Sequence, residues 1–202
     1  MRGWRQPLLW AVVGVWGAVA SAAAVKPGQA APEFKLNDAS GHVQSLSAQK
    51  GKWVVLEWLN HGCPFVKKHY DAGNMQALQT KYTGKGVVWF SVISSAPGKQ
   101  GAGTGAQVLE EAKEKKSAAT AILIDSDGKT GRAYGAQTTP DMYVISPKGT
   151  LVYMGAIDDK ASTEVSDIPN SKNYVAAALD EAMAGKPVTT ASTKSYGCSV
   201  KY

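Results

Sequence analysis

Residues 53–70 read WVVLEWLNHGCPFVKKHY and contain the features that decide the fold. The apolar run at 53–56 is typical of a buried strand, the polar residues at 60–62 of a turn, and Pro64 of the first turn of a helix. Cys63 is therefore expected between a strand and a helix, beside unpaired backbone N–H groups that favour a thiolate. Because the thiolate is the form of cysteine that attacks disulfides and peroxides, this segment predicts a redox site.

Further elements can be predicted on both sides of this segment from the spacing of apolar residues. We expect a hairpin around 38–41, a helix at 65–82 that Gly73-Asn74 kinks or splits, and a second hairpin around 146–149. The remaining strands and helices are expected at 86–93, 108–116, 121–124 and 174–183. This order predicts parallel strands joined by right-handed crossovers, with antiparallel strands added by the later hairpin. The fold class is therefore α/β, with a central mixed sheet flanked by helices, an N-terminal hairpin and a C-terminal tail.

The N-terminus of the 202-residue chain has the pattern of an export signal. Arg2 and Arg5 precede the apolar segment 8–20, and small residues suited to cleavage follow it. We predict an exported protein, periplasmic or secreted. The alternative is an uncleaved membrane anchor, because residues 8–25 are apolar apart from Ser21 and have the lower limit of a spanning length. The expected divisions are a signal peptide at 1–24, one domain at 25–187 and a tail at 188–202.

The charge of the chain is mild and excludes some classes of partner. There are 22 lysines and arginines and 16 acidic residues, and removal of Arg2 and Arg5 with the signal leaves a formal charge of +4. The lysines are scattered, and pairs such as Lys67-Lys68 are expected on solvated helix faces, so no nucleic-acid partner is predicted. The three histidines and two cysteines lack metal-ligand spacing, so neither a metal nor another cofactor is expected.

Three residues of the central segment have two interpretations each. Cys63 is either a small buried apolar residue or a nucleophile, and its position before Pro64 favours the nucleophile. Glu57, inside an apolar strand, is either buried with a raised pKa that suits proton transfer, or reaches solvent at the end of the sheet. His61 either lends positive charge to the sulfur or is an ordinary turn residue.

The glycine-rich segment 98–105 lacks a phosphate-loop ending and is expected to be a flexible loop beside this site.

Cys198 lies in the tail, four residues from the end of the chain. An extended tail would span on the order of 45 Å, which lets Cys198 reach Cys63. Two cysteines in an oxidising compartment make one pair. This pair is either catalytic or a structural bond that stabilises the fold by roughly 4–5 kcal/mol in the chain-entropy model. The pairing is either within one chain or between two copies in a homodimer.

Five short motifs together resemble a known group of proteins. They are NHGCPFV at 60–66, SSAPG at 94–98, YGA at 134–136, Thr139-Pro140, and YGCSVKY at 196–202. With them the chain resembles the thioredoxin-fold redoxins, and more closely the peroxiredoxin-like branch of the alkyl hydroperoxide reductase and thiol-specific antioxidant superfamily. The resemblance implies a thioredoxin-like fold.

The same resemblance implies roles for individual residues. Cys63 takes the place of the nucleophile, and Glu57 matches the buried acid six residues before it. Thr139-Pro140 matches a cis-proline site, where the backbone before the proline receives an extended substrate beside the sulfur. Without the resemblance, the base rate for X–Pro bonds would predict that Pro140 is an ordinary trans residue at the start of a strand.

Some positions depart from the family pattern. Val66 stands where thioredoxins have their second cysteine, so no disulfide can close within the motif. Asn60 replaces the threonine that typical peroxiredoxins place three residues before the cysteine. Arg132 does not match the arginine of those enzymes, so this sequence lacks a match for both the hydroxyl and the positive charge that hold a peroxide in them.

These observations give two hypotheses about function. In the first, the chain is an exported thiol-dependent oxidoreductase, a peroxiredoxin-like antioxidant. Cys63 attacks a peroxide or disulfide, Asn60 and the helix-start N–H groups stabilise charge, and Glu57 or His61 manages the proton. Cys198 then resolves the intermediate and an external thiol reductant protein restores both thiols. The residues that position the substrate are expected to be Pro64, Thr139 and Pro140.

The second hypothesis is a non-catalytic binding domain. In this case a permanent Cys63–Cys198 bond would lock the same fold, and the cis-proline surface would hold a partner.

Overall fold

The apolar run before Cys63 forms β3 (Val54–Trp58), and all five of its residues are buried. A strand with no solvent-facing side needs neighbours on both edges and layers on both faces. In the computed structural model, which describes residues 25–202, β3 accordingly lies inside a seven-stranded sheet. The apolar run predicted as a central strand is therefore confirmed.

The seven-stranded sheet is mixed and has the order β2-β1-β5-β4-β3-β7-β8. Strands β3, β4 and β5 are parallel, whereas β7 and β8 on one side and β1 and β2 on the other are antiparallel. The other strands of this sheet are β1 (Lys35–Asp38), β2 (Val43–Ser45), β4 (Val88–Ile93), β5 (Ala121–Ile124), β7 (Asp141–Ile145) and β8 (Leu151–Gly155). The predicted mixed sheet with two hairpins is confirmed.

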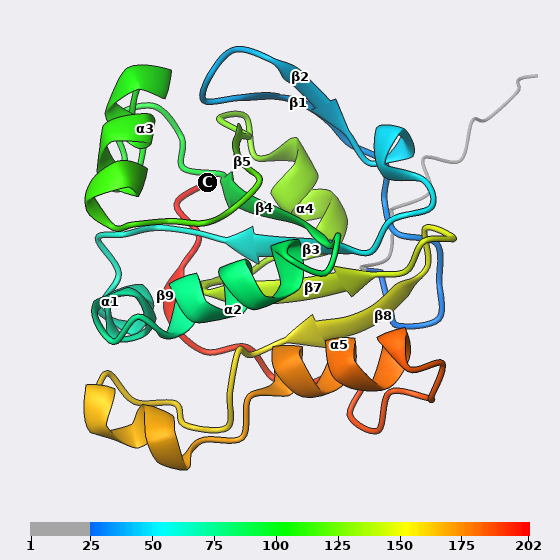
Figure 1. The fold of residues 1–202 in the computed structure, drawn as a ribbon. Coiled ribbons are helices and arrows are strands. Elements are labelled where there is room, and N and C mark those ends of the chain that lie inside the picture. Colours follow the sequence, from blue (N-terminus) through cyan, green and yellow to red (C-terminus); the bar gives the residue numbers. More distant parts are fainter. Residues whose placement is uncertain (1–24) are drawn as a thin grey trace, which may run out of the picture.

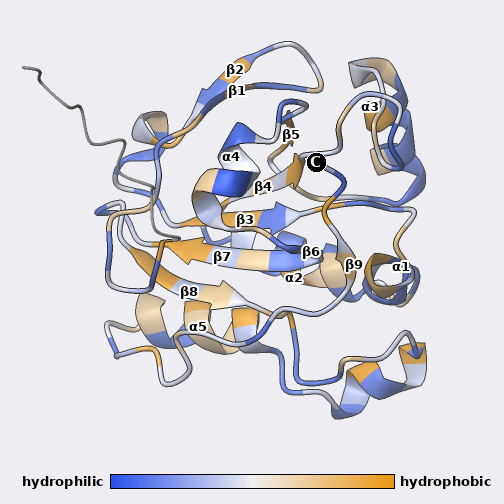
Figure 2. Ribbon diagram, turned by 180° about the vertical axis from the view of Figure 1, so that it is seen from behind, coloured by the Kyte–Doolittle hydropathy of each residue, from blue (hydrophilic) through white to orange (hydrophobic). Residues whose placement is uncertain are grey.

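A second sheet consists of two short strands beside the end of β3. β6 (Thr138–Thr139) pairs with β9 (Cys198–Ser199), so the tail returns to the strand that precedes Pro140. Figure 2 shows β6 and β9 next to each other, with α1 beside them. The peptide bond between Thr139 and Pro140 is cis, as the resemblance implies.

Helices cover both faces of the large sheet. In Figure 1, α2 and α5 lie in front of the sheet and α4 behind it. The helices are α1 (Pro64–Asp71), α2 (Asn74–Thr83), α3 (Gly105–Glu114), α4 (Lys129–Tyr134) and α5 (Tyr174–Met183), with 3₁₀ turns η1 (Ser47–Gln49) and η2 (Val165–Asn170). Alternate residues of β3 join two separate cores, because Val55 packs on the α2 and α5 side while Leu56 packs on the α4 side.

Several predicted boundaries change in the structure. The predicted helix at 65–82 is two helices, because Gly73 adopts a left-handed conformation with φ 71° between them. The helix predicted at 108–116 begins earlier, at Gly105, because Thr104 and Gln107 form a capping box. Sequence analysis missed α4 and η2, which are too short to show a period.

The predicted signal peptide at 1–24 lies outside the described residues and stays a prediction. Within residues 25–202, no helix has the length and apolar character needed to cross a membrane.

Candidate active site

The turn after β3 places Cys63 at the start of α1. The Asn60 backbone carbonyl accepts the Cys63 N–H at 2.9 Å, and the Asn60 side-chain oxygen accepts the Gly62 N–H at the same distance. Cys63 is the N-cap of α1 with extended backbone angles, and Pro64 occupies the first helical turn. The predicted helix-start position of Cys63 is therefore confirmed. Asn60 shapes this turn, and its hydrogen bonds join it to the turn backbone and to Gln100 of the glycine-rich loop.

The sulfur of Cys63 lies between the cis-proline loop and the tail. As a thiol it donates to the Thr139 carbonyl at 3.1 Å, and the Cys198 backbone N–H donates to the sulfur at 3.4 Å. Burial of the sulfur raises its pKa, but hydrogen bonds from the Cys198 side chain and from the Val66 and Cys198 backbone outweigh it. The net pKa of Cys63 is lowered. The ionised form is therefore stabilised at a sulfur that is 0 % exposed.

Cys198 has the opposite tendency. It lies directly opposite Thr139 in the β6–β9 pair and is partly exposed. Burial and the neighbouring Cys63 raise the pKa of Cys198 to about 11. When the pair loses one proton, the charge therefore lies on Cys63, while Cys198 remains a thiol that donates to it.

Glu57 is fully buried and binds core residues. Its carboxylate accepts four hydrogen bonds, from the side chains of Tyr70, Gln79, Trp89 and Ser91, at 2.8–3.1 Å. Burial raises the pKa of Glu57 although these bonds lower it. This carboxylate corresponds to the buried alternative of the sequence analysis, and the same hydrogen bonds attach it to α1, α2 and β4.

His61 is buried and neutral at physiological pH. Its ring lies edge-on to Tyr70 with 4.6 Å between ring centroids, and neither ring nitrogen has a hydrogen-bond partner among residues 25–202. Burial lowers the pKa of His61 to about 4. The alternative in which His61 lends positive charge to Cys63 is therefore wrong, because burial disfavours the imidazolium.

Sequence analysis missed a buried polar cluster at the side of α1, consisting of Lys68, His69, Asp158 and Tyr196. Lys68 Nζ is 3.7 Å from Asp158 Oδ2 and donates to the Lys160 carbonyl at 2.8 Å. The prediction that Lys68 is solvated is wrong, because the residue is 1 % exposed. The Tyr196 hydroxyl donates to Asp158 Oδ1 and lies 3.3 Å from His69 Nε2. No local pattern indicates contacts between residues this far apart in the chain.

Asp141 is a second functional candidate that sequence analysis missed. It follows Pro140 directly, is 3 % exposed, and accepts the Gln137 N–H at 3.1 Å. Burial raises its pKa to about 7, against hydrogen bonds from Gln137 and the Ser195 side chain. An acidic residue at the start of an apolar strand was the available signal.

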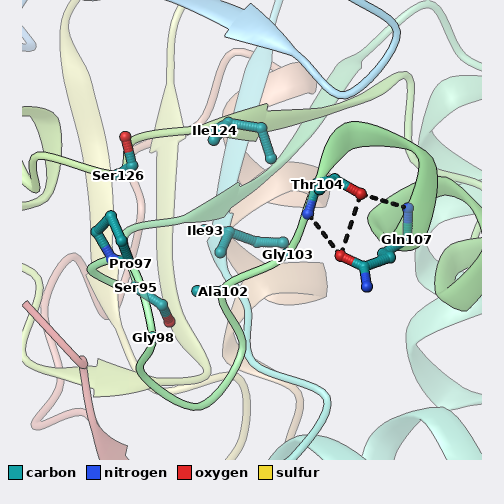
Figure 3. Close-up of a pocket in the computed structure, with 10 residues that line it drawn as sticks. All are labelled: Ile93, Ser95, Pro97, Gly98, Ala102, Gly103, Thr104, Gln107, Ile124 and Ser126. Atoms are coloured by element: carbon teal, nitrogen blue, oxygen red, sulfur yellow. Dashed lines mark hydrogen bonds between the residues drawn. The ribbon is translucent and has the colours of Figure 1, made fainter.

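The glycine-rich loop borders the site, as predicted. The Asn60 amide donates to the Gln100 side chain at 3.2 Å, and the Ser95 hydroxyl donates to the Gln100 carbonyl at 2.9 Å. A cavity of about 340 Å³ lies behind this loop, at the carboxyl ends of β4 and β5. Figure 3 shows the residues that line it. Its lining residues are Ile93, Ser95, Pro97, Gly98, Ala102, Gly103, Thr104, Gln107, Ile124 and Ser126. Neither cysteine lines this cavity, so it is a neighbour of the thiol site.

Arg132 and possible metal ligands bear on the chemistry of the site. Arg132 Nη1 donates to the Asp127 carbonyl at 2.8 Å, and its guanidinium lies 4.4 Å from the ring centroid of Tyr202. These contacts join Arg132 to the turn before α4 and to the end of the tail. Within residues 25–202 no group of three or more His, Cys, Asp or Glu side chains could hold a metal ion.

Comparison with known proteins identifies relatives of this chain. The model of the AhpC/TSA family matches residues 27–154. The thioredoxin-like protein YneN of Bacillus subtilis (strain 168) is 28% identical over 154 residues, which cover 71% of this chain and 81% of that protein.

Solved structures show the same fold. The hypothetical protein SMc02350 from Sinorhizobium meliloti 1021 has a TM-score of 0.73 and 26% identity, over 89% of this chain and 96% of that one. A putative thiol:disulfide interchange protein DsbE from Chlorobium tepidum has a TM-score of 0.51 and 23% identity, over 65% and 85% of the two chains, which is a likeness of fold alone. The chain therefore has a thioredoxin-like fold, as the resemblance implies.

Proposed function

This chain belongs to the AhpC/TSA family, and from that premise we propose that it is a thiol-dependent oxidoreductase whose working pair is Cys63 and Cys198. One observation carries the proposal: the two sulfur-bearing residues touch, and their pKa values move in opposite directions. A lowered pKa makes Cys63 the nucleophile and the better leaving group. A raised pKa keeps Cys198 protonated until it attacks the oxidised Cys63 sulfur.

The reaction proceeds in two oxidising steps when the oxidant is a disulfide. The Cys63 thiolate attacks one sulfur of the external disulfide, a mixed disulfide forms, and the other sulfur leaves as a thiolate. The Cys198 thiol then loses its proton and attacks the Cys63 sulfur, which releases the second external thiolate. The protein ends with a Cys63–Cys198 bond, and two electrons have reduced one external disulfide to two thiols. An external dithiol reductant reverses the change.

A peroxide would reach the same end point. The Cys63 thiolate attacks one peroxide oxygen, the O–O bond breaks, and the other oxygen takes a proton and leaves as an alcohol or water. Cys63 becomes a sulfenic acid. The Cys198 thiol then condenses with it to form the disulfide, with loss of water. The surroundings of Cys63 favour the disulfide as oxidant. A strand-borne sulfur is already accommodated opposite Thr139, and Arg132 is engaged elsewhere among the described residues. Pro64 and the Thr139-Pro140 backbone position the incoming group.

Rapid mixing distinguishes the oxidants and tests the pair. Wild type, Cys63→Ser and Cys198→Ser are mixed separately with hydrogen peroxide and with a small aromatic disulfide. We expect Cys63→Ser to lose the reaction with both oxidants, and Cys198→Ser to stop at a mixed disulfide or sulfenic acid. Equal consumption by wild type and Cys63→Ser would remove the enzymatic function.

The alternative is a structural disulfide in a non-catalytic domain. A redox titration separates the two, because structural bonds have potentials below about −300 mV and catalytic pairs lie higher. We further propose that the protein works after export, where residues 1–24 have been removed. Mass spectrometry of the N-terminus of the exported protein tests this.

A further inference from the structure

The tail is built into the fold over its whole last segment, residues 192–202. Ahead of Cys198, Thr193 donates its backbone N–H to Met154 at 3.1 Å. Beyond Cys198, the Lys201 carbonyl accepts the Ala96 N–H at 2.8 Å. The tail is thus held on both sides of the sulfur, in extended form, against one continuous surface.

The surface beneath the tail lacks the side chains that would obstruct it. A β-carbon added to Gly155 would collide with the Thr193 backbone, and one added to Gly131 would collide with the Tyr202 hydroxyl. Gly197 has φ +140° and lies against the Thr139 carbonyl so closely that a β-carbon there would overlap it. Gly155 and Gly131 thus form a groove beneath the tail, and Gly197 within the tail lets the strand approach the Thr139 carbonyl at van der Waals distance.

One contact anchors the strand next to its cysteine. Tyr196 packs its ring edge-on to Phe65 at 5.8 Å between centroids, and its hydroxyl donates to the buried carboxylate of Asp158. Lys68 lies 3.7 Å from the other oxygen of that carboxylate. Asn74 donates to His69 Nδ1 at 2.9 Å, which leaves Nε2–H to face the Tyr196 oxygen. The groups that face the phenol are therefore one anion, one neutral imidazole and one ammonium.

This arrangement closes the route to the nucleophile. Cys63 is fully buried, and the backbone edge of β6 beside it is already paired with β9. An extended segment from another protein would need the same edge, because an unpaired strand edge binds a strand through its N–H and C=O groups. The tail and an external strand therefore exclude each other.

We propose that residues 192–202 are a displaceable strand occupying the docking groove for an extended, cysteine-containing segment of a partner protein, and that the Tyr196 hydroxyl anchors this strand. The inference rests on the proposed function of Cys63 and adds a partner class and a specificity element to it. The tail itself indicates what fits: a residue without a side chain beside the Thr139 carbonyl, followed by cysteine.

A peptide of residues 192–202 is the probe for the groove, with its cysteine carried as a mixed disulfide with thionitrobenzoate. The Cys63 thiolate attacks the peptide sulfur, forms a protein–peptide disulfide and releases coloured thionitrobenzoate anion. The full-length protein carries Cys198→Ser so that its own tail cannot resolve the product. The rate is compared in this background alone, with Tyr196→Phe, and with Tyr82→Phe as matched control. The control removes a buried hydroxyl that donates to the Ala176 carbonyl, away from the tail.

We expect Tyr196→Phe to raise the peptide rate roughly ten- to hundredfold, the effect of one hydrogen bond to a charged group. The rate with iodoacetamide should rise less, because a small reagent needs only partial fraying. Tyr82→Phe should leave both rates as they were. Gly197→Ala should also raise the peptide rate, because its β-carbon would clash with the Thr139 carbonyl and displace the strand. This variant replaces Tyr196→Phe if that protein folds poorly.

Two results overturn the inference. One is a peptide rate in Tyr196→Phe equal to that of the control; the other is an equal gain for peptide and iodoacetamide. Failure of Cys63 to react with iodoacetamide, with peroxide and with a small aromatic disulfide in every variant would instead refute the proposed function.

Discussion

Asp141→Asn is expected to change how stability depends on pH. In the folded protein burial raises the pKa of Asp141 from 3.8 to about 7. The folded state therefore keeps this proton between about pH 4 and pH 7, where the unfolded chain has already lost it. Because the folded state binds more protons over this window, the free energy of unfolding falls as pH rises. At about 1.4 kcal/mol per pH unit, the loss is on the order of 4 kcal/mol.

The assay is urea unfolding at intervals from about pH 4 to pH 8 under reducing conditions, for wild type and Asp141→Asn. Glu57 also has a raised pKa and contributes the same sign, but it is common to both proteins. The difference between the two curves therefore isolates Asp141. We expect wild type to lose stability relative to Asp141→Asn across this window and the two curves to run parallel above about pH 7. Curves that are parallel throughout would refute the assignment of a buried, protonated carboxyl at this position.

Three further variants test other parts of the structure. Gly197→Ala should raise the alkylation rate of Cys63, measured by mass spectrometry, whereas Gly149→Ala, a positive-φ glycine with open space around it, should not; similar rates would contradict the tight fit of the tail. Burial raises the pKa of Glu57, so the wild-type protein should lose stability as the pH rises above about 4.5. Glu57→Gln should remove this loss, which urea unfolding at several pH values measures. Its effect on Cys63 oxidation should stay below the about hundredfold that loss of a direct general base causes, and a larger loss would place Glu57 in the proton transfer. Lys68→Met should destabilise the fold by roughly 3–5 kcal/mol in urea unfolding, because Asp158 is left as an uncompensated buried charge; an unchanged midpoint would mean that water reaches this cluster.

The parts of the fold that sequence analysis predicted are encoded locally. The apolar run of β3 and the proline after Cys63 specify strand, turn and helix start within a few residues. Gly73 marked the break between α1 and α2, since its conformation is accessible mainly to glycine. The resemblance added the cis bond before Pro140, which no local pattern indicates.

The missed parts depend on contacts distant in sequence. Lys68 reads as a solvated helix residue, and only the fold brings it to Asp158. The tail is polar and lacks periodicity, so its sequence does not predict where it docks. In the structure its position depends on glycines that leave room for it, such as Gly155. His61 illustrates a further limit, because its charge depends on burial that a turn sequence does not reveal. Local patterns thus predicted the position of the nucleophile, while its cover and electrostatics arise from tertiary packing.

The pairing of Cys63 with Cys198 is tested most directly by treating the reduced protein with one equivalent of oxidant and mapping the product by non-reducing peptide mass spectrometry. We expect a single bond between Cys63 and Cys198 of the same chain, absent in both single serine variants. Persistent oxidation of Cys63 beside a free Cys198 thiol, or a bond formed only between two chains, would contradict it.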